Sequence, residues 1–131
     1  MGNVKQTQGL AQLTDIALQA AHVKMAAIVA RETGLRENLA QLAIHDEKPK
    51  QVPVTMADAA FAADATVRWQ QWVDQRRTTI NTELAQVMAL KEHCRVDLAR
   101  AFGRDQAAKA LVARRAKTHE ARKLRRLYDE S

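Results

Sequence analysis

The sequence of 131 residues contains few aromatic residues, glycines, prolines and cysteines. Only 4% of the residues are aromatic, and there are four glycines, two prolines and one cysteine, while 47% are hydrophobic. A single cysteine excludes an internal disulfide framework. Many aliphatic residues with few aromatics favour long helices that pair through thin apolar seams. We find no apolar run of signal-peptide or membrane-span length, so we expect an intracellular, cytoplasmic protein.

Positive charge is concentrated in the second half of the chain. The net charge is +6. Residues 1–66 contain six Lys or Arg against seven Asp or Glu, and residues 67–131 contain fifteen against eight, so the halves carry −1 and +7. The second half is therefore the part that we expect to meet a partner of opposite charge.

One break interrupts the helical pattern, and it contains both prolines, Pro49 and Pro53. Proline lacks a backbone donor and biases the preceding residue away from the helix, which predicts a loop. Thr55 and Asp58 then fit a capping box, which predicts the start of a second helix. The predicted elements are a helix at about 8–44, a loop at 45–55 and a helix at about 56–127.

Each predicted helix has a repeating apolar stripe. The stripe of the first advances by alternating steps of three and four residues through Leu18, Ala21, Met25, Ile28, Glu32, Leu35, Leu39 and Leu42. In the second, every seventh residue is Val73, Ile80, Val87, Cys94, Ala101 or Ala108. The companion positions, each four residues after a member of that series, alternate between charged and apolar residues. They are Arg77, Leu84, Lys91, Leu98, Asp105 and Val112. This spacing predicts an all-α fold, a long antiparallel two-helix coiled-coil hairpin in one domain, 1–131.

The second predicted helix is longer than the first, about 105 Å against about 55 Å at 1.5 Å per residue. We expect the second helix to lie beside the first only up to about residues 90–100. Beyond that point the first helix has no residues left to pair with it, so a basic C-terminal helix projects. Gly103 leaves two paths open, because the helix either continues through it or bends there and folds back. For Phe102 we favour packing in the core, with a contact to a partner as the alternative.

Leu35, Leu39 and Leu42 are expected to close the hairpin against Val67, Trp69 and Val73. For Trp69 and Trp72 we favour a role as bulky core residues, with Arg68 or Arg76 over an indole face, and keep a docking site for another protein as the alternative.

The residues give little support to a catalytic role. The four histidines form no HExxH motif and no pair at metal-ligand spacing, and the chain has no phosphate-binding glycine loop. Cys94 falls on the apolar seam, where a thiol behaves as a small hydrophobe. We therefore predict no catalytic residue, no metal and no cofactor.

Residues 113–126, ARRAKTHEARKLRR, contain seven Lys or Arg and one carboxylate, Glu120. Such a helix is a solvated face, a nucleic-acid contact or a docking element for an acidic protein. Nucleic acid would use this charge density, but no aromatic platform precedes Tyr128 and no DNA-binding motif accompanies the run. Leucines among the charges favour an acidic protein groove. Nucleic acid, or a coiled coil that self-associates, stays the alternative.

The plan of two long helices, a proline-bearing turn near the first third and the arginine-rich run RWQQWVDQRRTTINTELAQVMALKEHCRVDLARAFGRDQAAKALVARR resembles the FliJ family of flagellar export proteins and its YscO relatives in type III secretion. The resemblance covers nearly the whole chain in organisation and composition. This chain departs from the plan of the family in that its first helix is shorter than its second.

The resemblance implies a non-enzymatic stalk or adaptor that inserts its joined termini into an export ATPase hexamer and meets export-gate or chaperone proteins. It also implies peripheral membrane association through the export apparatus. The residues that would face the ATPase are unpaired cations near the C-terminus, Arg100, Arg104, Arg114, Arg115, Arg122, Lys123, Arg125 and Arg126, with Phe102 as an apolar contact.

Overall fold

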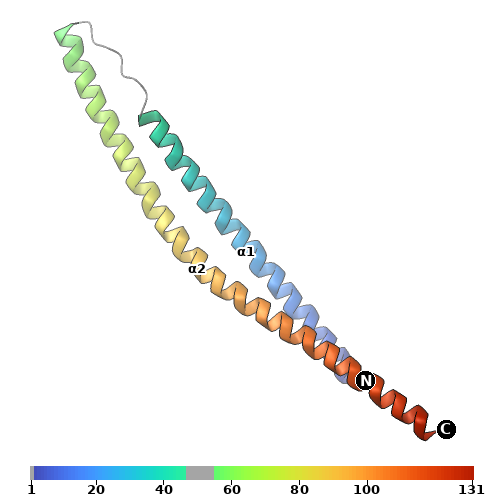
Figure 1. Ribbon diagram of the computed structural model, residues 1–131. Coiled ribbons are helices and arrows are strands. Elements are labelled where there is room, and N and C mark those ends of the chain that lie inside the picture. The colour runs from blue at the N-terminus through green and yellow to red at the C-terminus, as the bar shows by residue number, and fades with distance from the viewer. Residues whose placement is uncertain (1, 47–54) are drawn as a thin grey trace. The chain divides into compact units, whose positions relative to one another are not determined.

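The computed structural model describes residues 2–46 and 55–131, which form two α-helices. Helix α1 runs over Gly2–Asp46 and helix α2 over Met56–Asp129 (Figure 1). The all-α helical hairpin expected from the sequence is confirmed. Helix α1 begins six residues earlier than predicted. Pro49 and Pro53 of the predicted loop lie outside the described residues.

Helix α2 begins with the cap that the sequence predicts. The backbone N–H of Asp58 donates to Thr55 Oγ1 over 3.0 Å, and the N–H of Ala59 donates to the Thr55 carbonyl over 2.8 Å. These bonds satisfy amides that lack partners within the helix, and the Asp58 carboxylate lies near the positive end of the helix dipole.

The chain divides into two compact units, each containing a part of both helices. The terminal unit consists of Met1–Ala26 and Glu92–Ser131, and the central unit of Ala27–Lys91. Within each unit the two helices pack side by side and antiparallel. Every predicted seam position of both helices is buried or half-buried, including the charged ones.

The core of the central unit is a cluster of aliphatic side chains from both helices. Its buried members are Leu35, Leu42, Ile80 and Val87, and Ile28, Leu39 and Leu84 pack against them. The predicted partners of the leucines were wrong in part, because Val67 and Trp69 are 54% and 41% exposed. Helix α1 is paired about four turns further along α2 than predicted, since Lys91 lies against Glu32 and Leu84 packs in one cluster with Leu39. Val73 is fully buried but does not belong to this cluster.

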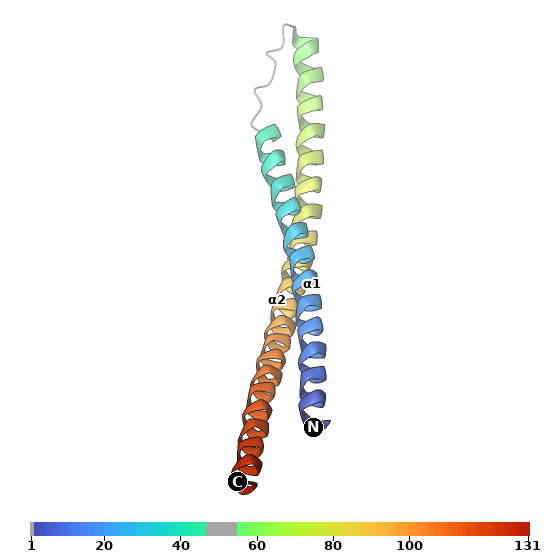
Figure 2. The ribbon, with the colours of Figure 1, turned by 90° about the vertical axis from the view of Figure 1, so that its right-hand side faces the viewer.

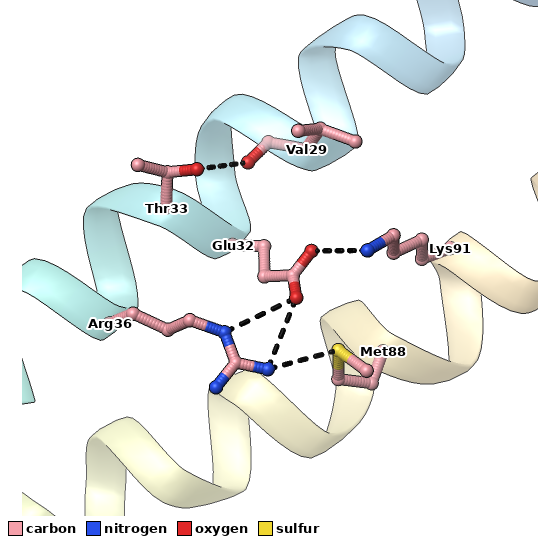
Figure 3. A network of polar contacts seen from close by, with 6 residues as sticks. All are labelled: Val29, Glu32, Thr33, Arg36, Met88 and Lys91. Atoms are coloured by element: carbon pink, nitrogen blue, oxygen red, sulfur yellow. Dashed lines mark hydrogen bonds and ion pairs between the residues drawn. The ribbon is translucent and has the colours of Figure 1, made fainter.

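Glu32 is the charged member of the α1 seam, and it is compensated across the helix pair (Figure 3). Lys91 Nζ lies 2.8 Å from Glu32 Oε2, and Arg36 Nη2 lies 3.1 Å from Glu32 Oε1. The same Arg36 nitrogen lies 3.7 Å from the sulfur of Met88. Two seam positions of opposite charge therefore face each other and help to fix the register of this unit.

In the terminal unit the seam of α1 continues towards its N-terminus with the same alternating steps. The added positions, all buried or half-buried, are Val4, Thr7, Ala11 and Thr14. The Thr14 hydroxyl donates to Asp105 Oδ1 over 3.1 Å. Asp105 is fully buried, and although its Oδ2 accepts no hydrogen bond of good geometry, Lys109 Nζ lies 2.9 Å away and compensates its charge.

The pairing of α2 extends further than the sequence suggested. Its last buried or half-buried positions are Ala108, Leu111 and Val112. The prediction that α1 has no residues left to pair with α2 beyond about residues 90–100 was therefore wrong. The cause is the earlier start of α1 together with the shifted register. Figures 1 and 2 show the last turns of α2 continuing past the N-terminal end of α1.

Helix α2 continues through Gly103 as helix, and none of its described residues has a left-handed backbone. A Cβ atom at this position would meet no heavy atom within 4 Å. We therefore expect Gly103→Ala to stabilise the protein by about 1 kcal/mol and to raise Tm by about 4 °C, because alanine restricts the unfolded chain and favours the helix. Ala107→Gly, an exposed position one turn later, should lower Tm by a similar amount in the same melting experiment. A destabilising Gly103→Ala change would contradict a continuous, open helix here.

The polar contacts of the two seams predict a loss of stability in acid. The hydrogen bond from Lys91 lowers the pKa of Glu32 below its ordinary value of 4.5, against the opposing effect of burial. The close contact with the Lys109 ammonium and, to a smaller extent, the hydrogen bond from Thr14 lower the pKa of Asp105 below its ordinary value of 3.8, against the opposing effect of burial. Each carboxylate therefore contributes stability that is present above its ordinary pKa and is lost as the pH falls through the folded-state pKa.

We expect Tm to fall from about pH 5 to about pH 3, and Glu32→Gln to reduce that slope while lowering Tm at neutral pH. The matched control is Glu92→Gln. Arg95 lowers the pKa of Glu92 as well, but both of these side chains are 63% exposed, so their ion pair contributes little. An unchanged acid slope in Glu32→Gln would show that the Glu32 contact does not stabilise the folded state.

Candidate interaction site at the C-terminus

Residues 113–129, here called the basic terminal segment, form the part of α2 that follows its last paired turn. Every residue of the segment is exposed. Thr7 and Val4 are the first covered positions of α1, and Val112 is the last of α2, so within the terminal unit α1 provides no partner for the segment. The predicted projecting basic helix is confirmed.

The seam of α2 changes its chemistry at this boundary. Counting on from Ala108 and Val112 with the same steps of three and four leads to Arg115, His119, Arg122 and Arg126. These four residues, the cationic stripe, occupy the line on α2 that aliphatic residues occupy while α1 is beside it. A surface of this kind cannot pair with another apolar seam, because burying guanidinium groups without anions is costly.

Three residues of the cationic stripe, together with the neighbouring Lys123, surround a shallow hollow on the helix surface. His119, Arg122, Lys123 and Arg126 line a depression of about 360 Å³. Over the described part of the chain, the cations of the basic terminal segment make no ion pair with a carboxylate, whereas Arg68 and Arg95 lie 3.0 and 2.7 Å from acidic neighbours. Uncompensated cations gathered along one line attract an anionic surface.

Apolar side chains accompany the cations on another side of the helix. Leu124 and Leu127 are 64% and 58% exposed, and Tyr128 is 84% exposed. At about 100° per residue these positions turn away from the cationic stripe. The segment thus presents a charged line for recognition on one side and a smaller apolar surface on another side.

The structure separates the predicted contact residues into groups. It brings Arg122, Lys123 and Arg126 together and places Arg115 on the same stripe, whereas Arg114 and Arg125 share a different face of the helix. Arg100 and Arg104 are exposed on the paired part of α2. Sequence reasoning missed His119, although continuing the seven-residue count past Val112 identifies it.

The favoured interpretation of Phe102 was wrong. Its side chain is 52% exposed on the paired part of α2, because it does not fall on the seam that Ala101 and Asp105 follow. Its role as an apolar contact for a partner stays a prediction.

The tryptophans also differ from the favoured prediction. Trp69 and Trp72 stack on each other, with ring centroids 5.2 Å apart and planes inclined by 25°, and Trp72 is 50% exposed. Arg68 forms an ion pair with Asp64. Trp72 lines a hollow together with Leu42 and Ile80, so the end of α1 lies beside this indole but leaves half of it exposed, and the two indoles cover part of each other.

Cys94 is half-buried on the seam, as predicted. Within residues 2–46 and 55–131, no three His, Cys, Asp or Glu side chains gather in a way that could hold a metal ion.

Helix α1 contains a stretch that the sequence interpretation overlooked. Among the described residues, Asn3–Ile44 contains an 18-residue window with a mean hydropathy of 1.3, so this helix is long and apolar enough, by length and composition alone, to cross a membrane. The statement that no such run exists was therefore wrong. The core helix of a soluble protein meets the same test by composition, and although the seam of α1 packs on α2, none of this window is fully buried. A cytoplasmic location stays a prediction.

Comparison with family models, with curated proteins and with solved structures finds no match to this chain.

Proposed function

We propose that the protein is a non-enzymatic adaptor that docks through its basic terminal segment on an acidic protein surface. The observation that carries this proposal is the cationic stripe, Arg115, His119, Arg122 and Arg126, which continues the line of the seam beyond the end of α1. The spacing of a coiled coil is kept, while its apolar residues are replaced by cations. The complementary surface is one that offers carboxylates at helical spacing.

Arginine suits such a contact better than lysine does. Its planar guanidinium donates two parallel hydrogen bonds to one carboxylate, and it is more weakly hydrated than an ammonium group. Three of the four stripe residues are arginines, and none of them has a carboxylate partner among the described residues. A partner carboxylate would therefore gain a charge-assisted hydrogen bond without first breaking an ion pair in this protein.

We further propose that the acidic surface belongs to the ATPase hexamer of a flagellar-type export system, where the chain would act as a stalk. This step rests on the resemblance to the FliJ and YscO proteins. The helical hairpin supports it, and so does the presence of both chain ends in one unit, from which the basic terminal segment projects.

The experiment compares binding of the full chain to the purified export ATPase and to a DNA duplex of random sequence, at about 150 mM salt, by fluorescence anisotropy. We expect saturable binding to the ATPase and only weak binding to the duplex. Binding to the duplex alone, falling steeply with salt, would instead assign the segment to nucleic acid. Binding to neither would leave the helix a solvated surface and overturn the proposal.

A further inference from the structure

Helix α1 carries a second apolar line on the side away from its seam with α2. Starting at Leu13 and advancing by alternating steps of three and four residues, it consists of Leu13, Ile16, Ala20, Val23, Ala27 and Ala30. We call these six residues the outer stripe. This is the spacing of a coiled-coil seam, repeated on a face that α2 does not cover.

The aliphatic members of the outer stripe are among the most exposed large apolar side chains of the protein. Leu13, Ile16 and Val23 are 66%, 62% and 71% exposed, and the three alanines are also exposed. A helix with apolar residues on two opposite faces is typical of a helix that is covered on both. Single exposed aliphatic residues are ordinary, but a periodic line of them indicates an interface.

The part of α1 that carries the outer stripe has few charged residues. Between residues 6 and 30 the only charged side chains are Asp15 and Lys24. An amphipathic helix that lies on an anionic membrane has many Lys or Arg beside its apolar face, and this one does not. The charges near the stripe are single and of both signs, Asp15, Lys24 and Arg31 on α1 and Asp97 on α2, so neither an acidic nor a basic partner would find a matching charged surface. The surface suits a neutral, apolar helix, and α1 is itself such a helix.

We infer that the outer stripe binds the outer stripe of a second copy of this chain, with the two α1 helices antiparallel. In this arrangement Leu13 of one copy faces Ala30 of the other, Ile16 faces Ala27, and Ala20 faces Val23. Each branched or long aliphatic side chain then meets an alanine, which is the alternation of large and small residues that lets layers interdigitate. The contact is the same from both sides, as a two-fold interface requires.

The parallel arrangement lacks this fit. It would place Leu13 against Leu13 and Ala20 against Ala20, so that layers would be alternately crowded and empty. It would also bring the two basic terminal segments to the same end, where seven cations of each copy would repel one another. The antiparallel arrangement keeps the segments apart.

A shallow groove beside the stripe provides further room for close packing. It has a volume of about 610 Å³ and is lined by apolar side chains of the terminal unit, Ala17, Ala20, Ala21, Val23 and Cys94, together with the charged residues Lys24 and Asp97. Small residues let two helices approach closely, so side chains of a second helix have space next to the outer stripe.

The first test is the mass of the full chain in solution, measured by sedimentation over about a hundredfold range of concentration. We expect the mass to rise to twice the 14.7 kDa of one chain. Ile16→Glu with Val23→Glu should raise the dimer dissociation constant at least about tenfold, because two carboxylates would enter an apolar interface. Both positions are exposed, so helicity should be retained. Ala99→Glu with Gln106→Glu, which add the same charges at exposed positions of α2, should leave the dimer intact.

The second test determines the direction of the helices by oxidation of cysteine variants in a Cys94→Ala chain. Ile16→Cys and Ala27→Cys should form a disulfide when the two variants are mixed, but neither should cross-link with itself. In the antiparallel arrangement the two copies of residue 16 are eleven residues, about 16 Å, apart along the axis, which is too far for a disulfide. Self-linking of each variant without linking in the mixture would overturn the antiparallel interface.

A chain that stays monomeric throughout, or a dimer that the two glutamates do not weaken, would also overturn the inference. So would a monomer that binds vesicles of anionic lipid through Ile16 and Val23. The proposed docking function is tested separately, because the basic terminal segment does not take part in this interface. Loss of the dimer with normal binding to the ATPase, or the reverse, would distinguish the failure of one proposal from that of the other.

Discussion

Changing Arg115, Arg122 and Arg126 to Glu is expected to abolish binding to the export ATPase, with a dissociation constant at least about a hundredfold higher. Each reversal removes a charge-assisted hydrogen bond and places like charges opposite each other. The three residues are exposed and have no carboxylate partner within the described residues, so the thermal melt should stay nearly unchanged. Titration of the variant against labelled ATPase measures the loss.

The matched control reverses three exposed cations elsewhere, Lys5, Arg31 and Arg76, and so changes the net charge by the same amount. This control should bind the ATPase to within about threefold of the unchanged chain at physiological salt, where charges at a distance are screened. Equal losses in both variants would show that net charge alone controls binding and that the cationic stripe has no particular role.

The largest expected effect on stability is that of Ile80→Ala, at about 2–5 kcal/mol of unfolding free energy. Ile80 is 2% exposed and belongs to the cluster with Leu42, Leu35 and Val87. Removing its side chain leaves a cavity between the two helices, which a pair with no third layer has few ways to fill. Urea unfolding followed by circular dichroism measures the change.

Two further alanine variants check the register of the central unit. Leu90→Ala and Val67→Ala remove side chains that are 48% and 54% exposed, so each should cost less than about 1 kcal/mol. If Val67→Ala costs more than Ile80→Ala, the leucines at the end of α1 pack against the beginning of α2, and the register given above is wrong.

Helix periodicity was the feature that could be predicted best from the sequence. Seam positions from Leu18 to Leu42 and from Val73 to Val112 could be assigned, because burial along paired helices repeats with the heptad. The register could not be assigned in the same way. A slip by seven residues leaves the apolar pattern almost unchanged, so the pattern alone does not select one pairing.

Polar seam residues contain the information that the apolar pattern lacks. Glu32 and Lys91 interrupt their seams with opposite charges, and Thr14 faces Asp105. Pairing these interruptions with each other would have predicted the register and the later end of the paired region. Trp69 and Trp72 were misjudged for the same reason, since in the true register both indoles stay about half exposed.

The candidate site was predicted in outline. Charge density located the basic terminal segment, but the composition of the run did not show which of its cations act together. That distinction depends on the seven-residue count, which places Arg115, His119, Arg122 and Arg126 on one line and leaves Arg114 and Arg125 on another face.

Amide hydrogen exchange of the full chain, alone and with the export ATPase, tests the central claim most directly. Residues 113–129 lack a helix partner in the terminal unit, so their amides should exchange faster than those of the paired residues 92–112 in the free protein. Adding the ATPase should slow exchange in 113–129 at least about tenfold, as docking covers and stabilises the helix. Slow exchange of 113–129 in the free chain, or unchanged exchange there while the ATPase is bound, would contradict the account.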